Sequence, residues 1–303
     1  MSHALNTGTL QVTDEDQLQR ALAGYNHTRM APSHDDSDWE EQLGADHAMR
    51  LIEGRLMQRE LAKVRARASE APRDAEQFVT WFEQLKETGP GQNDPLFPWL
   101  REQANLEQMR WFLRQEMAGE AGFEDLVALT QVRLPSRPKL EMARNYWDEM
   151  GQGHEGGMHG PLLSRLGEEL DIGGPDDNRD IVVEALSLGN LMVAMAMNRH
   201  HAYQSIGALG VIELTAPGRA EQVNLGLKRL GVAGAARRYF ALHATLDKKH
   251  SAAWDAEVLR PIVEEDPDAS VALAEGALIR LHAGARCFER YRKELGLLPR
   301  MVR

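Results

Sequence analysis

The sequence predicts an all-α protein, a bundle of roughly seven or more helices. Apolar residues recur three and four positions apart almost throughout the 303 residues, whereas the alternating pattern of a half-buried strand is nearly absent. Short stretches rich in glycine, proline and aspartate interrupt this periodicity and mark the loops between helices. Neither a convincing internal repeat nor a low-complexity tract is present in the sequence, which leaves a bundle as the expected architecture.

Loop signals divide the chain into an N-terminal extension and a main body. The break SEAPRD, at 69–74, separates residues 1–73 from residues 74–303, and the first 35 or so residues are polar enough that we expect them to be loose. TAPG is expected to end a helix because Pro217 has no N–H to donate. The expected helices cover residues 37–68, 74–86, 103–132 with an interruption at 118–125, 139–151, 181–214, 219–230, 235–256 and 267–293.

The composition limits the classes of partner. A formal net charge of −11 disfavours nucleic acid and an anionic membrane, and it leaves room for bound cations that neutralise carboxylates. The one cysteine, Cys287, excludes an intramolecular disulfide and a thiolate metal cluster. The first residues lack a basic flank and an apolar run, and no stretch reaches the ~18 apolar residues that span a bilayer. We therefore expect a cytoplasmic protein.

The stretch HATLDKKH, residues 243–250, indicates half of a metal site. Each helical residue turns about 100°, so Asp247 lies about 40° and His250 about 20° away from His243 around the axis, and all three share one face. Imidazole and carboxylate together suit iron, manganese or zinc. A solvated face is the alternative, because Lys248 and Lys249 lie in the same segment.

Other segments offer the ligands that one helix cannot supply. Glu213 stands alone in the apolar stretch SIGALGVIEL, where a carboxylate is costly to bury unless it is paired or bound to a metal. Glu149 and His159 are ten residues apart, so on a regular helix both could reach one site, although four glycines between them weaken that helix. A buried salt bridge is the alternative role for Glu213.

A third segment places acidic residues four apart. Glu116, Glu120 and Glu124 would share one helix face, for which an acidic surface is the favoured alternative. Counted together, three histidines and three or four carboxylates come from four separate helices. A helical bundle with such ligands is the usual way to build a carboxylate-bridged dinuclear iron site, with open positions for O₂.

Four features of the sequence together resemble a known family. RQEMAGEAGFEDLVALTQ, KLEMARNYWDEMGQGHEGGMH, Glu213 and YFALHATLDKKH are similar to the haem-oxygenase-like di-iron oxidases and oxygenases, also called iron-containing redox enzymes, over about residues 75 to 295. The resemblance implies a haem-oxygenase-like bundle of about seven core helices without haem. Glu116, one turn before Glu120, is an alternative ligand. The implied iron ligands are Glu120, Glu149, His159, Glu213, His243, Asp247 and His250.

The resemblance also implies a chemistry. Members use two labile iron ions (Fe²⁺/Fe³⁺) and O₂ for amine N-oxygenation, oxidative C–C cleavage, desaturation or fatty-acid decarboxylation. A Glu ten residues before the His resembles the N-oxygenase branch, which favours N-oxygenation of a small amine- or carboxylate-bearing metabolite. His159 and His243 are expected to bind one iron each. An external reductant, ferredoxin-like or a small molecule, would restore Fe²⁺, and a helical extension used for dimerisation in this family suggests a homodimer.

Residues beside Glu213 are predicted to form the substrate pocket. Ile206 and Gly210 share its helix face and Tyr203 lies at the edge of that face, with close helix packing as the alternative. Tyr239, one turn before His243, is expected to supply a supporting hydrogen bond.

The resemblance leaves the identity of the substrate and the nature of the protein open to rival interpretations. Arg237 or Arg238 is a candidate for binding a substrate carboxylate. Two other classes remain: an iron-storage protein of bundle type, and a metal-free binding module of the same fold. A zinc hydrolase is a weaker alternative, because hydrolytic zinc sites usually contain fewer carboxylates.

Overall fold

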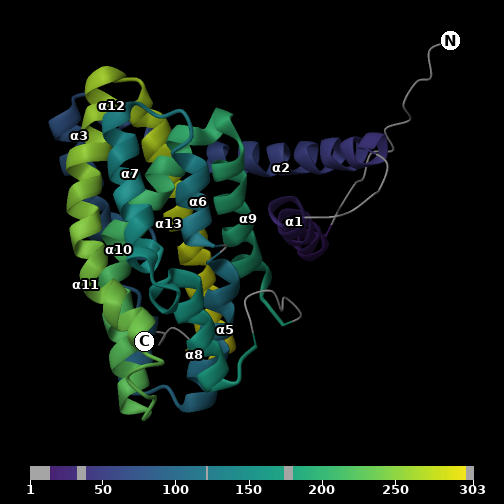
Figure 1. Ribbon diagram of the computed structural model, residues 1–303, viewed down its shortest axis with the longest axis vertical. Coiled ribbons are helices and arrows are strands. Elements are labelled where there is room, and N and C mark those ends of the chain that lie inside the picture. Colours follow the sequence, from purple (N-terminus) through teal and green to yellow (C-terminus); the bar gives the residue numbers. More distant parts are fainter. Residues whose placement is uncertain (1–13, 33–38, 121, 174–179, 298–303) are drawn as a thin grey trace, which may run out of the picture.

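The computed structural model describes residues 14–32, 39–120, 122–173 and 180–297. Over these ranges the chain is built from helices, and the β-type pairing that it contains is an isolated bridge between Met150 and Met158. The all-α prediction is therefore confirmed, and the helices pack into an elongated bundle from which the N-terminal pair extends to one side (Figure 1). None of the helices described is both long enough and apolar enough to cross a membrane.

The helices follow one another with short connections. In chain order they are α1 (Glu15–Met30), α2 (Trp39–Ala68), α3 (Ala75–Thr88), α4 (Leu96–Glu102), α5 (Leu106–Gly119), α6 (Phe123–Thr130), α7 (Ser136–Glu149), α8 (His159–Leu170), α9 (Val183–Met197), α10 (Ala202–Arg229), α11 (Arg238–Trp254), α12 (Arg260–Glu265) and α13 (Ala269–Glu294). Short 3₁₀ turns lie at Gly151–Gly153, Glu155–Gly157 and Arg199–His201, and a π turn at Asp255–Leu259.

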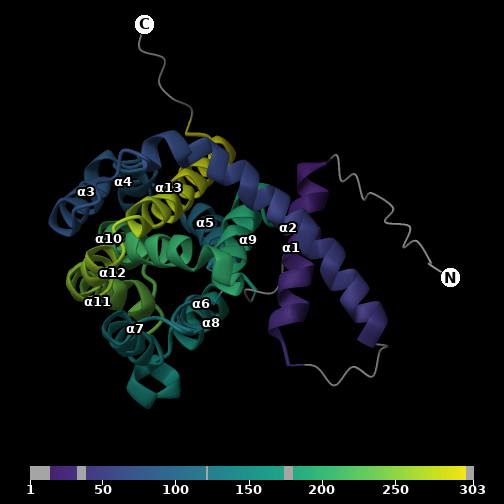
Figure 2. The ribbon, with the colours of Figure 1, turned by 90° about the horizontal axis from the view of Figure 1, so that it is seen from above.

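The expectation that the first 35 or so residues are loose is wrong for Glu15–Met30, which form α1. This helix lies against α9 (Figure 2), and it buries Leu22 together with a polar network. The Asn190 amide donates to the backbone and side-chain oxygens of Gln19, both at 2.8 Å, and the Asn26 amide donates to Asn190 at 2.9 Å. The rest of that segment, 1–13 and 33–35, lies outside the described residues.

The helix expected at 37–68 is confirmed by α2, which joins the extension to the main body through buried charges. Glu53 forms an ion pair with Arg29 of α1 and accepts a 2.6 Å hydrogen bond from Asn198. Glu60 pairs with Arg286 of α13 at 3.1 Å. The extension therefore packs on the bundle, and the proposed division at residue 73 stays a prediction.

The helix expected at 181–214 is wrong in two places. It breaks after Met197, where the Asn198 side chain donates to the carbonyl of Ala194 at 2.7 Å, and it resumes as α10. TAPG does not end α10, which continues through Pro217 to Arg229. Because a proline removes one N–H donor, the helical bond lost is the one to the carbonyl four residues earlier, and packing on both sides preserves the remaining turns.

Helix α10 is at the centre of the bundle and packs extensively against α11 and α13. Its approach to α13 depends on glycine, since a Cβ added at Gly207 would overlap the carbonyl oxygen of Leu273. Small residues thus bring two long backbones close together, which fixes the position of every side chain that α10 presents to the interior.

We expect Gly207→Ala to lower the free energy of unfolding by roughly 2 kcal/mol or more, because backbone atoms cannot move aside as a flexible side chain can. Gly218→Ala is the matched control in the same helix, where an added Cβ meets nothing within 4 Å. That control should stabilise the protein by up to about 1 kcal/mol. Urea unfolding of both variants measures the difference, and equal effects would contradict the close-packing argument.

Asp255, in the π turn after α11, is expected to make the free energy of unfolding depend on pH. Burial and then the charge of Glu83 raise its pKa to about 7. The folded state therefore keeps a proton that the unfolded chain releases near pH 4, so this residue reduces stability as pH rises from about 4 through 7. Asp255→Asn should stabilise the protein by roughly 2–4 kcal/mol at pH 8 and hardly at all at pH 5. Denaturant titrations at the two pH values check this, and a change independent of pH would oppose it.

Candidate metal centre

The three residues of the α11 motif lie on one buried face, as helix periodicity predicts. His243, Asp247 and His250 are 7%, 4% and 6% exposed, whereas the neighbouring Lys248 and Lys249 are exposed. The solvated-face alternative is therefore wrong for the motif, and the lysines form the outward face of the same helix. The buried face is directed toward side chains from α7, α8 and α10.

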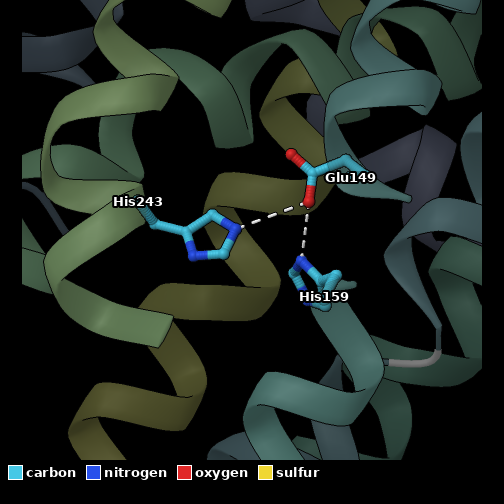
Figure 3. Close-up of side chains that lie close together, drawn as sticks. All are labelled: Glu149, His159 and His243. Atoms are coloured by element: carbon cyan, nitrogen blue, oxygen red, sulfur yellow. Dashed lines mark hydrogen bonds and ion pairs between the residues drawn. The ribbon is translucent and has the colours of Figure 1, made fainter. Parts of the chain in front are cut away.

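Glu149, the last residue of α7, lies at the centre of the site. Its Oε2 atom is 2.9 Å from Nδ1 of His159 and 3.4 Å from Nε2 of His243 (Figure 3). Its other oxygen, Oε1, is 3.7 Å from Nδ1 of His250. The two oxygens of one carboxylate therefore face two different groups of ligand-type atoms. One group is Glu149, His159 and His243, and the other is Glu149, Asp247 and His250, and within each group the ligand-type atoms lie within 4.8 Å of one another.

The connection between Glu149 and His159 differs from the helix that we expected. The chain leaves α7 after Glu149, makes two 3₁₀ turns, and begins α8 at His159. Gly151 has φ 60°, and a Cβ there would lie 2.5 Å from the backbone of Gly157. The glycines therefore allow a tight excursion that returns His159 to the side chain of Glu149, a proximity that helical geometry did not supply.

The second group is completed by α10. Nδ1 of His250 is 3.4 Å from Oε2 of Glu213, whose Oε1 accepts a 2.6 Å hydrogen bond from the Asn145 amide. Nε2 of His250 is 3.2 Å from Asp148. Glu213 thus lies among histidine and amide partners. The two histidines that we expected on separate irons, His159 and His243, instead fall in the same group of ligand-type atoms.

The acidic stripe on α5 does not continue as one face, because the helix is interrupted between Gly119 and Phe123. Glu120 lies at that interruption with an oxygen 3.4 Å from Nε2 of His159, so it borders the first group. Glu124 instead accepts a 3.3 Å hydrogen bond from the backbone of Gly160. The side chain of Glu120 is half-buried and lines a cavity beside the first group, so it is a partly accessible candidate ligand.

The predicted supporting role of Tyr239 has a clear geometry. Its backbone carbonyl is 2.7 Å from Nδ1 of His243, so a proton on Nδ1 leaves Nε2 free to face Glu149. The Tyr239 hydroxyl lies 3.2 Å from Nε2 of His159, and the Phe123 ring stacks on that imidazole with 5.7 Å between centroids. The rings of both histidines are therefore held in place.

Burial and mutual charge shift the titration of these groups. Burial opposes ionisation of Glu149, yet hydrogen bonds with His159 and His243 hold its pKa well below its usual range. Burial, and then the charge of Glu213, raise the pKa of Asp247 to about 8. Burial alone would lower the pKa of His250, but its contact with Glu213 raises it to about 9. The cluster therefore attracts positive charge, either protons or cations.

A cavity of about 90 Å³ opens beside these groups. Its walls are largely apolar, and its charged lining includes Glu116, one turn from Glu120 and within reach of the charges of Arg280 and Arg219. Glu116 feels the charges of both arginines and of Glu120, and it belongs to neither of the two groups of ligand-type atoms described above. The apolar residues that line the cavity are Phe97, Phe112, Leu113, Met117, Phe123, Leu163, Ile212, Ala216, Ala220, Val223 and Phe240.

The predicted pocket residues Tyr203, Ile206 and Gly210 do not line this cavity. A Cβ at Gly210 would lie 2.5 Å from Nε1 of Trp254, so the small residue serves close helix packing, the alternative that we had left open. The cavity lies further along α10, at Ile212 and beyond, which the face of Glu213 alone did not reveal.

The candidate arginines Arg237 and Arg238 are also outside the cavity lining. Arg237 donates to Val232 at 2.9 Å and Asn224 at 2.7 Å, and Arg238 is exposed. The arginines that do line the cavity are Arg219 of α10 and Arg280 of α13. They are far apart in the sequence, so no local pattern of residues pairs them.

The residues present fit a pair of iron ions. Asp247 Oδ1 is a buried atom without a hydrogen-bond partner. His250 Nδ1 is buried with carboxylate oxygens of Glu213 and Glu149 at 3.4 and 3.7 Å, and both residues lie in one group of ligand-type atoms. Buried polar atoms are seldom left unpaired unless another ligand completes them. Imidazole nitrogens and carboxylate oxygens are suitable donors for iron, and Glu149 is placed to bridge two ions.

Fold and site together define an all-α protein with a buried histidine–carboxylate centre beside a largely apolar cavity. A family model described as iron-containing redox enzyme matches residues 110–285, more than half of the chain. The protein belongs to this family, and the resemblance inferred from its motifs is confirmed. A search of curated proteins gives no match.

We expect Glu149→Gln to reduce the iron bound per chain to less than half of the wild-type amount, because both groups share this carboxylate. Glu155→Gln, an exposed position in the adjoining loop, is the matched control and should bind iron like the wild type. Metal analysis after anaerobic loading with Fe²⁺ gives the answer. Full loading of the Glu149 variant would exclude it as a shared ligand.

Proposed function

We propose that this iron-containing redox enzyme is a non-haem di-iron oxygenase that uses O₂ to oxidise a small amine- or carboxylate-bearing metabolite. The observation that carries the proposal is the position of Glu149, whose two oxygens face two separate groups of buried ligand-type atoms. A single-metal site would need only one such group. The N-oxygenation that we propose is supported by the ten-residue spacing of Glu149 and His159, which the glycine turns bring into contact.

The ligands divide between two ions in this proposal. Glu120, His159 and His243 hold one, while Glu213, Asp247 and His250 hold the other. Glu149 belongs to both groups of ligand-type atoms and would help to hold both ions. Four carboxylates match the four positive charges of two ferrous ions, so the loaded centre is close to electrically neutral within the apolar bundle.

The protein's own residues then perform three tasks. The iron pair, when bound, supplies the electrons with which O₂ is reduced. The apolar walls at Phe112, Phe123 and Ile212 exclude water and place a substrate beside the centre. Tyr239 fixes the orientation of two histidines. Because the centre is buried, we propose that an external reductant, ferredoxin-like or a small molecule, restores the ferrous state.

The decisive experiment is an anaerobic titration with Fe²⁺ followed by exposure to O₂ in the presence of amines and acids. We expect two irons per chain, substrate-dependent O₂ consumption and an oxygenated product detected by mass spectrometry. Asp247→Ala and Glu213→Ala should each lose at least one iron. Many irons per chain with no substrate dependence would instead show a storage protein. A metal-free binding module would bind the same amines or acids equally well after the metal has been removed with a chelator and in the His243→Ala variant.

A further inference from the structure

The cavity has a second charged region that the metal centre does not use. Arg219 of α10 and Arg280 of α13 both line it, together with Glu116 of α5. Each guanidinium group carries a full positive charge, and two of them in one small cavity repel each other. Burial, and then the charge of Arg280, lower the pKa of Arg219 to about 10.

Packing and one hydroxyl hold the Arg219 guanidinium in place. Its Nη2 donates to Oγ1 of Thr215 at 3.1 Å. Its Cζ lies 5.6 Å from the ring centroid of Phe288 and 5.9 Å from that of Phe97, distances typical of cation–π contact. The side chain is therefore ordered without a carboxylate partner, and its remaining N–H groups are available to a ligand.

The guanidinium group of Arg280 has fewer hydrogen-bond partners than that of Arg219. Its Nε is buried and has no hydrogen-bond partner. Within the described chain, no carboxylate oxygen lies within 4.0 Å of either guanidinium group. Arg280 as a whole is half-buried. A guanidinium that is removed from water in a stable protein is normally paired, because an uncompensated charge is costly.

The charges lining the cavity indicate what is missing. Five carboxylates line it, and four of them are the candidate ligands Glu120, Glu149, Glu213 and Asp247. Two ferrous ions would balance these four, which leaves Glu116 as the single carboxyl group against two arginines. The surplus is at least one positive charge, and a monoanionic group would offset it.

We propose that Arg219 and Arg280 form the binding site for the carboxylate of a monoanionic substrate. The inference rests on the proposed function for the reaction that follows, since the candidate metal ligands line the same cavity. Paired guanidinium N–H groups match the two oxygens of a carboxylate, and the apolar wall between the two ends receives a short carbon chain. The substrate is therefore a small carboxylic acid whose anionic end is held away from the metals and whose other end is presented to them.

The wild-type protein provides the first test. Straight-chain carboxylates from butyrate to octanoate are titrated into Fe²⁺-loaded protein without O₂ and followed by calorimetry, beside the carboxamides and alkylamines of equal length. We expect at least one carboxylate to bind ten or more times tighter than its carboxamide, because only the acid carries the charge that the arginines lack. Equal affinity for acid and amide across the series would overturn the proposal.

Variants assign the effect to the two arginines. Arg280→Gln and Arg219→Gln should each weaken carboxylate binding tenfold or more and leave the amide unchanged, while Arg280→Lys should recover part of the affinity. Arg290→Gln is the matched control on α13, since Arg290 pairs with Glu184 and Glu294 outside the cavity. Retained affinity in both glutamine variants would overturn the assignment.

Iron content, measured on every sample, separates the two proposals. A wild-type chain that prefers carboxylates through these arginines but binds no iron would refute only the di-iron function. A chain that binds two irons without preferring carboxylates would refute only the anion site.

Discussion

The burial of carboxylates inside a helical bundle is the constraint on which the rest of this structure depends. Glu149, Glu213 and Asp247 are each at most 4% exposed, where an isolated ionised carboxylate costs far more free energy than the fold can supply. Histidines provide part of the compensating charge. They do not provide all of it, because burial and the charge of Glu213 keep Asp247 protonated until about pH 8. Cations between the two groups would complete the balance, so the amino acids themselves indicate a metal.

The backbone arrangement follows from the need to converge these groups. Helix α10 crosses the centre of the bundle because Gly207 lets it approach the backbone of α13 closely. Glu213 and Arg219 lie on this helix on either side of Pro217, so one element serves both the metal centre and the positive end of the cavity. Across the bundle, the turns after α7 allow Glu149 and His159 to meet although no helix joins them. The close packing of α10 against α13 and the glycine turns after α7 together set the geometry of the metal centre.

Helix periodicity was sufficient to predict whatever depends on one helix. It placed His243, Asp247 and His250 on a common buried face, and the isolation of Glu213 in an apolar run indicated a partnered carboxylate. Periodicity failed where the structure depends on tertiary contacts. Helix α1 was missed because two of its three buried residues, Gln19 and Asn26, are polar, and only Leu22 is apolar. Pro217 was given too much weight, because a local rule on hydrogen bonding cannot include the packing that preserves the helix around it.

The arginines of the cavity were missed for a related reason, since on a helix an arginine usually indicates solvated surface. Their position in the cavity is informative because the metal centre does not require them, and both side chains are half-buried. If iron balances the four ligand carboxylates, Arg219 and Arg280 add a net positive charge to an apolar interior and so destabilise the empty protein. An arrangement that is unfavourable without a ligand and balanced with one is typical of a binding site. The same electrostatic reasoning that assigns cations to the acidic end of the cavity therefore assigns an anion to the other end, and the substrate must span the apolar distance between them.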